Sequence, residues 1–429
     1  MKKILVILLV ITTVFTLSAC RGGSSGEEDP IKEGELISLK YWNSLTGADG
    51  DIMRSLVKQF NEEHKDKIEV NETFVNEVDY YTNINLLVPQ KRGPDVAIMH
   101  SYLVQSYAKR GILTKMSDMV ERSAMNTSDY ITDVVNSLYY EEELYGVPLD
   151  VHTVGIYYNK TLLEKYDLEV PKNREELLNA ARVVQEGEGS SNVWGLPIST
   201  TWPSEWIFTT ALYQNGGMEI DESLDPAYNS TEGAAALKSV ADIIHTEALS
   251  PKNLSVDQDL FLFQSGKALF HIQGSWMLRS IIDSGINFGV LPMSQMFGSD
   301  AQNKNDIAAR SHTFVIPTQN RDMQTLKEEA IMTFVKYMGD HSYIWAEAGQ
   351  IPASNIARAT DEYLALPYHS GFGNVDHFRV AAQSPTFHEA FSPVYSRVTA
   401  ALSNQSYNAT LLLNAAAEEG KQLMEEANR

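Results

Sequence analysis

Tryptophan side chains at the ends of predicted strands and helices are the residues of this sequence best suited to contact a ligand. The tryptophans expected at such ends are Trp42, Trp202, Trp206, Trp276 and Trp345. The ring carbons of a sugar present C–H groups that pack on aromatic faces, and its hydroxyls need polar partners. Candidate partners near other predicted strand ends are Asn43, Asp95, Asp150, Arg310 and His312. Together these residues predict a carbohydrate-binding cleft.

The stretch 268–276 shows how the sequence positions one of these rings. Its short apolar run ends in Gly274-Ser275, which predicts a buried strand that feeds a helix with Ser275 as its N-cap. Trp276 then lies at the carboxyl end of a strand, where ligand crevices form in α/β sheets. His271 and Gln273 are polar for a buried strand, so we expect one of them to face the cleft or a lobe junction.

Motifs of common enzymes are missing from the sequence. It contains no Walker-type phosphate loop and no dinucleotide-binding fingerprint. The ten histidines show no metal-ligand spacing, and His369 and His377 come nearest to a cluster. Acidic runs such as residues 141–143 are expected to be solvated faces in so acidic a chain. We therefore predict no catalytic residue, no cofactor and no metal site.

The first residues predict export and lipidation. Lys2 and Lys3 precede an apolar run at 4–19 that is too short for a comfortable membrane span, so residues 1–19 are predicted to be a signal peptide. Leu17-Ser18-Ala19-Cys20 resembles the bacterial lipobox, in which the cysteine is lipidated and becomes the mature N-terminus. Cys20 is the only cysteine, which excludes an intrachain disulfide and a thiolate metal site. Residues 20–35, rich in Gly, Ser and acids, are predicted to be a flexible tether.

The net charge restricts the partners of the mature chain. Removal of residues 1–19 takes away two lysines and no acid, so the net charge of −22 becomes −24. So negative a surface argues against binding to nucleic acid and against adsorption to anionic lipid, because both attract cations. We expect a domain held by its lipid on the extracytoplasmic face of the cell membrane.

Alternating strand and helix patterns predict two α/β lobes. Strands at 37–41, 68–74 and 96–99 alternate with helices from residue 51 and at 80–88, the pattern of a parallel sheet. The loops after the first and third strands, at 42–43 and 100–102, should open on one edge. A second alternation begins with a strand at 151–158 and a strand-like run at 193–198, and the chain turns back near residue 286. We assign residues 36–150 and 286–337 to lobe 1, and residues 151–285 and 338–429 to lobe 2.

Short motifs in a characteristic order carry a family resemblance. They are Trp42-Asn43, Gly93-Pro94-Asp95-Val96, Tyr145-Gly146-Val147-Pro148, Tyr157-Tyr158-Asn159-Lys160, Gly266-Lys267-Ala268, Gly274-Ser275-Trp276 and Gly349-Gln350-Ile351-Pro352. With the lipobox, the chain resembles a family 1 extracellular solute-binding protein of an ABC importer, similar to maltose-binding protein. The resemblance implies a periplasmic-binding-protein-like fold with discontinuous lobes and a hinged cleft, ligand-driven closure, delivery to permease subunits and a monomeric state. It places Trp42, Asn43, the segment after Asp95, Asp150 and Trp276 at the cleft.

Other functions remain open from the sequence. Some relatives bind anionic solutes, and an anion would need an arginine in the cleft, for which the candidates are Arg279, Arg310 and Arg379. A secreted polysaccharide-degrading enzyme would share the aromatic cleft but needs two carboxyls at a defined spacing, and no such pair is evident. A subunit that presents its ligand to a signalling receptor has the same sequence features as an importer subunit. The number of aromatic rings favours an oligosaccharide over a monosaccharide.

Overall fold

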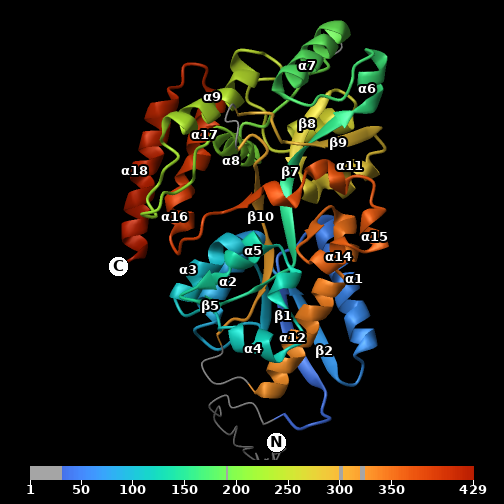
Figure 1. Cartoon of the computed structure of the whole chain (residues 1–429), viewed down its shortest axis with the longest axis vertical. Coiled ribbons are helices and arrows are strands. Elements are labelled where there is room, and N and C mark those ends of the chain that lie inside the picture. Colours follow the sequence, from blue (N-terminus) through green and yellow to red (C-terminus); the bar gives the residue numbers. More distant parts are fainter. Residues whose placement is uncertain (1–30, 190–191, 299–302, 319–323) are drawn as a thin grey trace, which may run out of the picture.

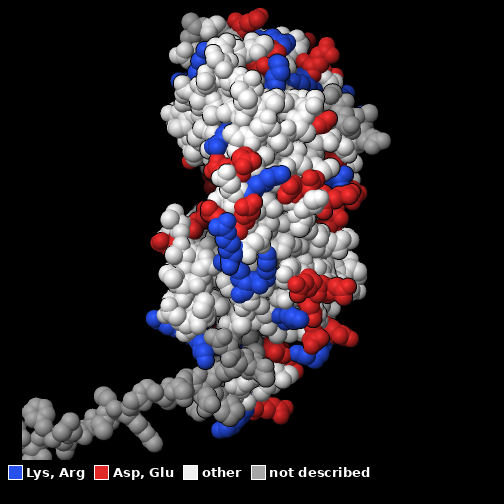
Figure 2. Space-filling model, turned by 90° about the vertical axis from the view of Figure 1, so that its left-hand side faces the viewer, with Lys and Arg blue, Asp and Glu red and all other residues white. Residues whose placement is uncertain are grey.

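The computed structural model describes residues 31–189, 192–298, 303–318 and 324–429. The predicted signal peptide, Cys20 and the tether up to residue 30 lie outside the described residues. The chain forms two lobes, which lie one above the other in Figure 1 and are separated by an indentation on one side in Figure 2. None of the described helices is both long and apolar enough to cross a membrane.

The lower lobe in Figure 1, lobe 1, is built on a five-stranded sheet of order β2-β1-β3-β11-β6. Its strands are β1 Ile37–Asn43, β2 Ile68–Phe74, β3 Val96–His100, β6 Val147–Pro148 and β11 His312–Val315. The first three are parallel, and β11 is antiparallel to both of its neighbours. A separate short hairpin joins β4 Tyr139–Tyr140 to β5 Glu143–Leu144.

Helices cover the lobe 1 sheet. They are α1 Gly47–Glu63, α2 Glu77–Leu87, α3 Ser101–Lys109, α4 Ser117–Arg122, α5 Thr132–Asn136, α12 Thr325–Asp340 and α13 Ser342–Trp345. In α1, the buried residues Met53, Leu56, Val57 and Phe60 recur at helical spacing, so one face of the helix enters the core. The residues that build lobe 1 therefore come from both the beginning and the last third of the chain.

The upper lobe, lobe 2, is organised around one long strand. Its sheet contains β7 Asp150–Asn159, β8 Phe270–Gly274, β9 Phe288–Pro292, β10 Ile307–Arg310, β12 Ile351–Pro352 and β13 Phe378–Val380. The first residues of β7 pair with β10 and β12, and its last residues pair with β8 and β9. Nine of its ten residues are buried, which fits an apolar strand enclosed on both faces.

Most of the remaining helices surround this second sheet. They are α6 Lys160–Lys165, α7 Arg174–Glu188, α8 Ser204–Gln214, α9 Thr231–His245, α10 Gln258–Gln264, α11 Leu278–Asp283, α16 Phe387–Phe391, α17 Pro393–Ser403 and α18 Ala409–Ala427. The short helices α14 Asn355–Arg358 and α15 Asp361–Leu364 contact α13 of lobe 1 instead. Side chains of Asn173, Ser230 and Asn408 accept a hydrogen bond from the first turn of α7, α9 and α18. The lobe has its own hydrophobic core.

The lobes are joined where strands pass directly from one sheet to the other. Leu149 is the only residue between β6 in lobe 1 and β7 in lobe 2, and Ser311 is the only residue between β10 and β11. The two crossings are bonded to each other, because the Leu149 amide donates to the carbonyl of His312 at 2.8 Å. A third connection leads from α13 to β12, which pairs with the start of β7.

The expected lobe boundaries are wrong at two places. Residues 286–310 were assigned to lobe 1, but β9 and β10 pair with β7 in lobe 2. Residues after 337 were assigned to lobe 2, but Trp345 is buried in the core of lobe 1. Residues 193–198 form no strand, only a single bridge from Trp194 to Ala268. Residue patterns locate strands, whereas hydrogen-bond partners far along the chain decide which sheet a strand joins.

The aromatic contacts of Phe334 test the discontinuous assembly of lobe 1. This α12 side chain is fully buried, with its ring centroid 5.3 Å from that of Tyr41, 5.2 Å from Phe60 and 5.8 Å from Phe314. Phe334→Ala should lower the free energy of unfolding by about 3–5 kcal/mol in urea denaturation, because it opens a cavity under the sheet. Thr333→Ala, on the exposed side of the same helix, is the control. Equal stability of the two variants would contradict this packing.

Candidate functional site: the cleft between the lobes

A cavity of about 750 Å³ lies between the lobes. Lobe 1 contributes the loop after β1 and the start of α1, together with Glu77, His100, Tyr102 and His312. Lobe 2 contributes the following lining residues: His152, Trp202, Glu205, Trp206, Thr209, Trp276, Met277, Arg279, Ser280, Asp283, Arg310, Phe391 and Tyr395. A ligand in this cavity would touch both lobes at once.

Three tryptophans form one wall of the cavity. Trp202 and Trp206 flank the start of α8, and Trp276 follows β8. The centroid of Trp276 lies 5.8 Å from that of Trp202 and 5.4 Å from that of Trp206, in tilted arrangements. Trp202 remains 44% exposed, whereas Trp206 is buried and Trp276 is partly buried. The wall therefore offers large aromatic surface beside polar groups.

Gly274 allows Trp276 to take its place in this wall. A Cβ atom at Gly274 would lie 2.2 Å from Cε2 and Cζ2 of the indole, closer than carbon atoms can approach. The ring therefore folds back over the end of its own strand. Ser275 does not cap the following helix as expected, because a short 3₁₀ turn at Ser275–Met277 precedes α11.

Asp150 holds the floor of the cavity together from beneath. Its carboxylate accepts hydrogen bonds from the backbone N–H of His312 at 2.9 Å, from Nδ1 of His312 at 2.7 Å and from Nε1 of Trp345 at 2.8 Å. Nδ1 of His152 lies 3.2 Å from Oδ1, the oxygen that accepts from the His312 backbone N–H. Asp150 is fully buried and does not line the cavity. It therefore positions the histidines that do.

The buried groups at the cavity floor differ in charge: Asp150 is ionised, and the pKa of one of the three histidines is raised while the pKa values of the other two are lowered. Burial alone would raise the pKa of Asp150, but His312 and His152 lower it well below its ordinary value. Burial also acts to lower the pKa of His312, yet the Asp150 carboxylate outweighs it and raises that pKa. Burial and the neighbouring His312 lower the pKa of His152 to about 4, and the same causes keep the pKa of His100 well below normal. At neutral pH, His100 and His152 are thus neutral imidazoles.

Arg310 is already neutralised by a partner. Its Nη2 donates to Glu219 at 3.0 Å, and its Nη1 donates to the carbonyl of Ala309. The guanidinium lies 5.3 Å from the centroid of Trp206, at cation–π distance. Arg279 pairs with Asp283 on the same helix, 3.0 Å away. Both arginines of the cavity wall therefore have carboxylate partners, and the wall carries further acids.

Two of these acids stay protonated to unusually high pH. Burial raises the pKa of Glu205 to about 7, and it raises the pKa of Asp49 to about 7 as well. Asp49 accepts a hydrogen bond from Gln350 at 2.9 Å through Oδ2. Its Oδ1 is shielded from solvent and has no hydrogen-bond partner among the described residues. These carboxyls can donate or accept hydrogen bonds near neutral pH, which suits recognition of hydroxyl groups.

Comparison with known proteins decides the family. The model of the family described as bacterial extracellular solute-binding protein matches residues 44–343. The chain belongs to this family. It is 22% identical to the galactooligosaccharide-binding protein of Bacillus subtilis over 306 residues, covering 69% of this chain and 68% of that protein. It is also 22% identical to the maltotriose-binding protein of Pyrococcus abyssi over 353 residues, covering 80% and 73%.

A solved structure supports the same architecture. The ABC substrate-binding protein Lmo0181 of Listeria monocytogenes, in complex with cycloalternan, superposes with a TM-score of 0.76 at 20% identity, covering 91% of this chain and 99% of that one. The predicted two-lobed α/β solute-binding fold is therefore confirmed, and so is the extracytoplasmic placement of the family. As a member of a solute-binding family, the chain is a binding protein and not an enzyme.

Half of the predicted contact residues do not line the interlobe cavity. Trp42 packs against the core of lobe 1. Asn43 is buried and donates to Glu72 at 2.7 Å, and Asp95 accepts from the Lys40 amide and pairs with Lys327. Trp345 and Asp150 are completely buried against each other. Asn43, Asp95, Asp150 and Trp345 thus already have polar partners within lobe 1 or at the junction.

The other half of the predicted contact residues do line the cavity, namely Trp202, Trp206, Trp276, Arg310 and His312. His152, Glu205, Asp49, Phe391 and Tyr395 were missed. His152 lies within a mostly apolar strand, and Glu205 lies in the first turn of a helix. At such positions a structural role is as common as a binding role, so the sequence offered no reason to choose them. His100 ends the third strand and Tyr102 lies just after it, and the end of this strand was expected at the open edge. Of the arginines considered for an anion, Arg379 pairs with Asp306 outside this cavity.

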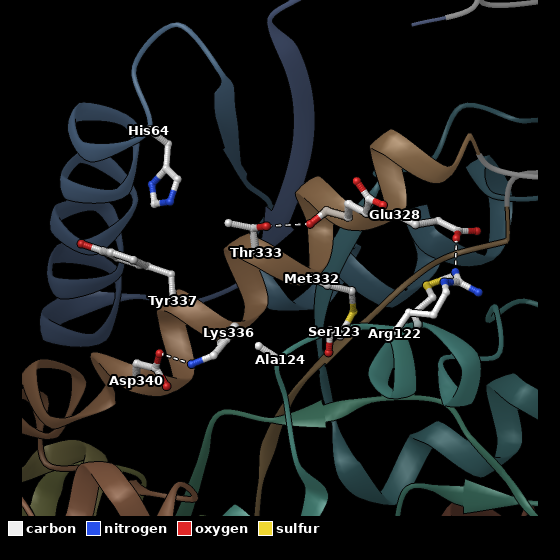
Figure 3. A pocket seen from close by; sticks show the side chains of 12 residues that line it. His64, Arg122, Ser123, Ala124, Glu328, Met332, Thr333, Lys336, Tyr337 and Asp340 are labelled. Carbon is white, nitrogen blue, oxygen red and sulfur yellow. Dashed lines mark hydrogen bonds and ion pairs between the residues drawn. The ribbon is translucent and has the colours of Figure 1, made fainter. Parts of the chain in front are cut away.

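A second, smaller hollow of about 380 Å³ lies beside α12 on lobe 1 (Figure 3). Four of its charged side chains already contact one another, as shown by the dashed lines from Arg122 to Glu328 and from Lys336 to Asp340. The hollow is confined to one lobe and carries no wall of tryptophans. The interlobe cavity is therefore the better candidate for the solute site.

Removal of the Asp150 carboxylate should destabilise the protein strongly. Asp150→Ala leaves the N–H groups of His312 and Trp345 buried without an acceptor, so the free energy of unfolding should fall by about 3–5 kcal/mol. Asp283→Ala removes an exposed partner of Arg279 and should cost less than about 1 kcal/mol. Urea denaturation of both variants compares the two sites. A loss no larger for Asp150→Ala would contradict its role at the junction.

Glu205 should make stability depend on pH near neutrality. Its folded pKa of about 7 lies above the ordinary glutamate value, so the folded state binds more protons between the two values. The stability that protonated Glu205 contributes to the folded state is fully present below about pH 4 and is lost as the pH rises through 7. Glu205→Gln should lack the loss, so the stability of the wild type relative to the variant falls by roughly 2–3 kcal/mol between pH 4.5 and 8. Parallel pH profiles in denaturation would show that Glu205 is not buried as described.

Proposed function

We propose that the chain is the carbohydrate-binding subunit of an ABC importer, and that its solute is an oligosaccharide. The wall formed by Trp202, Trp206 and Trp276 in the interlobe cavity carries the proposal. Pyranose faces stack on such rings, and several rings suit several sugar units. His312, Glu205 and Asp49 provide hydrogen-bonding groups next to the wall. The relatives named for galactooligosaccharide and maltotriose support this solute class.

The mechanism of capture follows from the position of the cavity. The lobes are connected by short crossings at Leu149 and Ser311, so a small change in backbone angles there rotates one lobe against the other. A sugar stacked on the lobe 2 tryptophans reaches lobe 1 groups such as His100 and Tyr102 only when the lobes are close. The solute then favours the closed state by the contacts that this state adds. The closed, loaded monomer delivers the sugar to the permease subunits.

Attachment to the cell membrane forms part of the proposal. The lipobox-like sequence ending at Cys20 supports lipidation of that cysteine, with residues 21–35 as a tether between the lipid and lobe 1. The sequence feature fits the extracytoplasmic site of action of the family. A lipid on Cys20 would keep the protein near the importer.

Anionic solutes are less well served by this cavity. Its two arginines, Arg279 and Arg310, are paired with Asp283 and Glu219. Asp49, Glu77 and Glu205 add acidic groups to the wall. A phosphate or carboxylate would have to displace these partners and approach further acids, which is unfavourable.

The first experiment is a thermal-shift screen of the purified protein against monosaccharides, oligosaccharides, sugar phosphates and amino acids. A ligand at a hundredfold excess over its dissociation constant adds about 2.7 kcal/mol to stability and raises the melting temperature. We expect the largest rise with an oligosaccharide, little changed by salt. A rise limited to sugar phosphates, and weakened by salt, would replace the proposed solute class by an anion.

Truncation of the aromatic wall should weaken binding of the sugar found in that screen. Trp276→Ala should raise the dissociation constant about 5- to 150-fold in isothermal titration, which corresponds to about 1–3 kcal/mol. Gly274→Ala should weaken binding too, because a Cβ there displaces the same ring. Trp194→Ala is the matched control, since Trp194 lies away from this cavity. Unchanged affinity in Trp276→Ala would exclude stacking on this residue.

A further inference from the structure

Three histidines from three different strands converge at the floor of the interlobe cavity. His100 ends β3, His152 lies in β7 and His312 begins β11. One ring nitrogen of each lies within 4.8 Å of those of the other two. The ring of His312 is central, with its centroid 4.4 Å from that of His152 and 5.1 Å from that of His100. No spacing in the sequence indicates this cluster, since the three residues are far apart along the chain.

Nδ1 of each histidine is held by a neighbouring group. Nδ1 of His312 and Nδ1 of His152 both face the carboxylate of Asp150, at 2.7 Å and 3.2 Å. Nδ1 of His100 lies 2.7 Å from the hydroxyl of Tyr81. Because all three Nδ1 atoms are engaged, the Nε2 atoms remain for an external ligand. A carboxylate behind metal-binding histidines is the usual arrangement that fixes ring orientation and increases basicity.

We propose that His100, His152 and His312 bind a divalent transition metal ion, with Zn²⁺ as the best fit. Imidazole nitrogen suits Zn²⁺ and its late first-row neighbours, and three imidazoles leave a fourth coordination position open. A tetrahedral site with Zn–N bonds of about 2.0–2.1 Å needs nitrogens roughly 3.3 Å apart, so small side-chain rotations close the cluster around the ion.

The surroundings of the cluster favour a cation. The three histidines all line the solute cavity, so the open position faces the space that a solute occupies. Asp49 and Glu77 also line that cavity, and their carboxyl groups act on His312. The inference does not depend on the solute being a sugar, because it concerns the ion alone. A bound ion would offer its open position to an oxygen atom of the solute.

The test is titration of the chelator-treated, purified protein with Zn²⁺ by calorimetry, and with Co²⁺ by visible absorption spectroscopy. We expect one saturable equivalent of Zn²⁺ and the intense visible bands of a four-coordinate Co²⁺ site. His100→Gln and His312→Gln should each weaken Zn²⁺ binding at least about tenfold, and Tyr81→Phe should weaken it measurably through the orientation of His100. His377→Gln changes a partly exposed histidine outside the cavity and should bind like the wild type.

The outcomes separate this inference from the proposed function. Absence of a saturable Zn²⁺ site in the wild type, or equal weakening by His377→Gln, would overturn the metal site whatever the protein does with sugars. Circular dichroism and melting curves verify the fold of each variant. Should His312→Gln lose its fold, the Tyr81→Phe variant and the Co²⁺ spectrum of the wild type still decide the matter. Zn²⁺ binding without any sugar response would support the ion site and remove the carbohydrate proposal.

Discussion

The buried carboxylate of Asp150 is the interaction on which both the architecture and the site depend. It lies at the start of β7, one residue after the crossing at Leu149, and it accepts hydrogen bonds from His312 at the other crossing. It also accepts from Trp345, which belongs to the core of lobe 1. A single charge thus joins the two direct connections between the lobes, and its burial is tolerated because every partner is a hydrogen-bond donor.

This arrangement separates the residues that hold the cleft from those that can meet a solute. Asp150 and Trp345 lie behind the cavity floor, while His152 and His312 lie in front of them and line it. The acidic composition of the chain also extends into the cavity, where its arginines are already paired. The result is a cleft with one aromatic wall, a histidine floor and two acids of raised pKa, which matches neutral polar solutes better than anions.

Much of the fold was predictable because its signals are local. The alternation of strand and helix in residues 37–100, the face of α1 and the order of the family motifs all follow from nearby residues. Nearby residues did not predict which of the two sheets each strand joins. β9 and β10 look like any short apolar strand, and only their pairing with the far end and the near end of β7 assigns them to lobe 2.

The sequence by itself determined the class of protein, the predicted export signal and the tryptophans most able to bind a sugar. Tertiary structure decided which of them face the interlobe cavity. Trp276 reaches the cavity because Gly274 leaves room for its ring, whereas Trp345 turns inward to a buried carboxylate. The histidine cluster exists only where strands from both lobes meet, since contacts between residues far apart in the chain arise from folding and leave no spacing in the sequence.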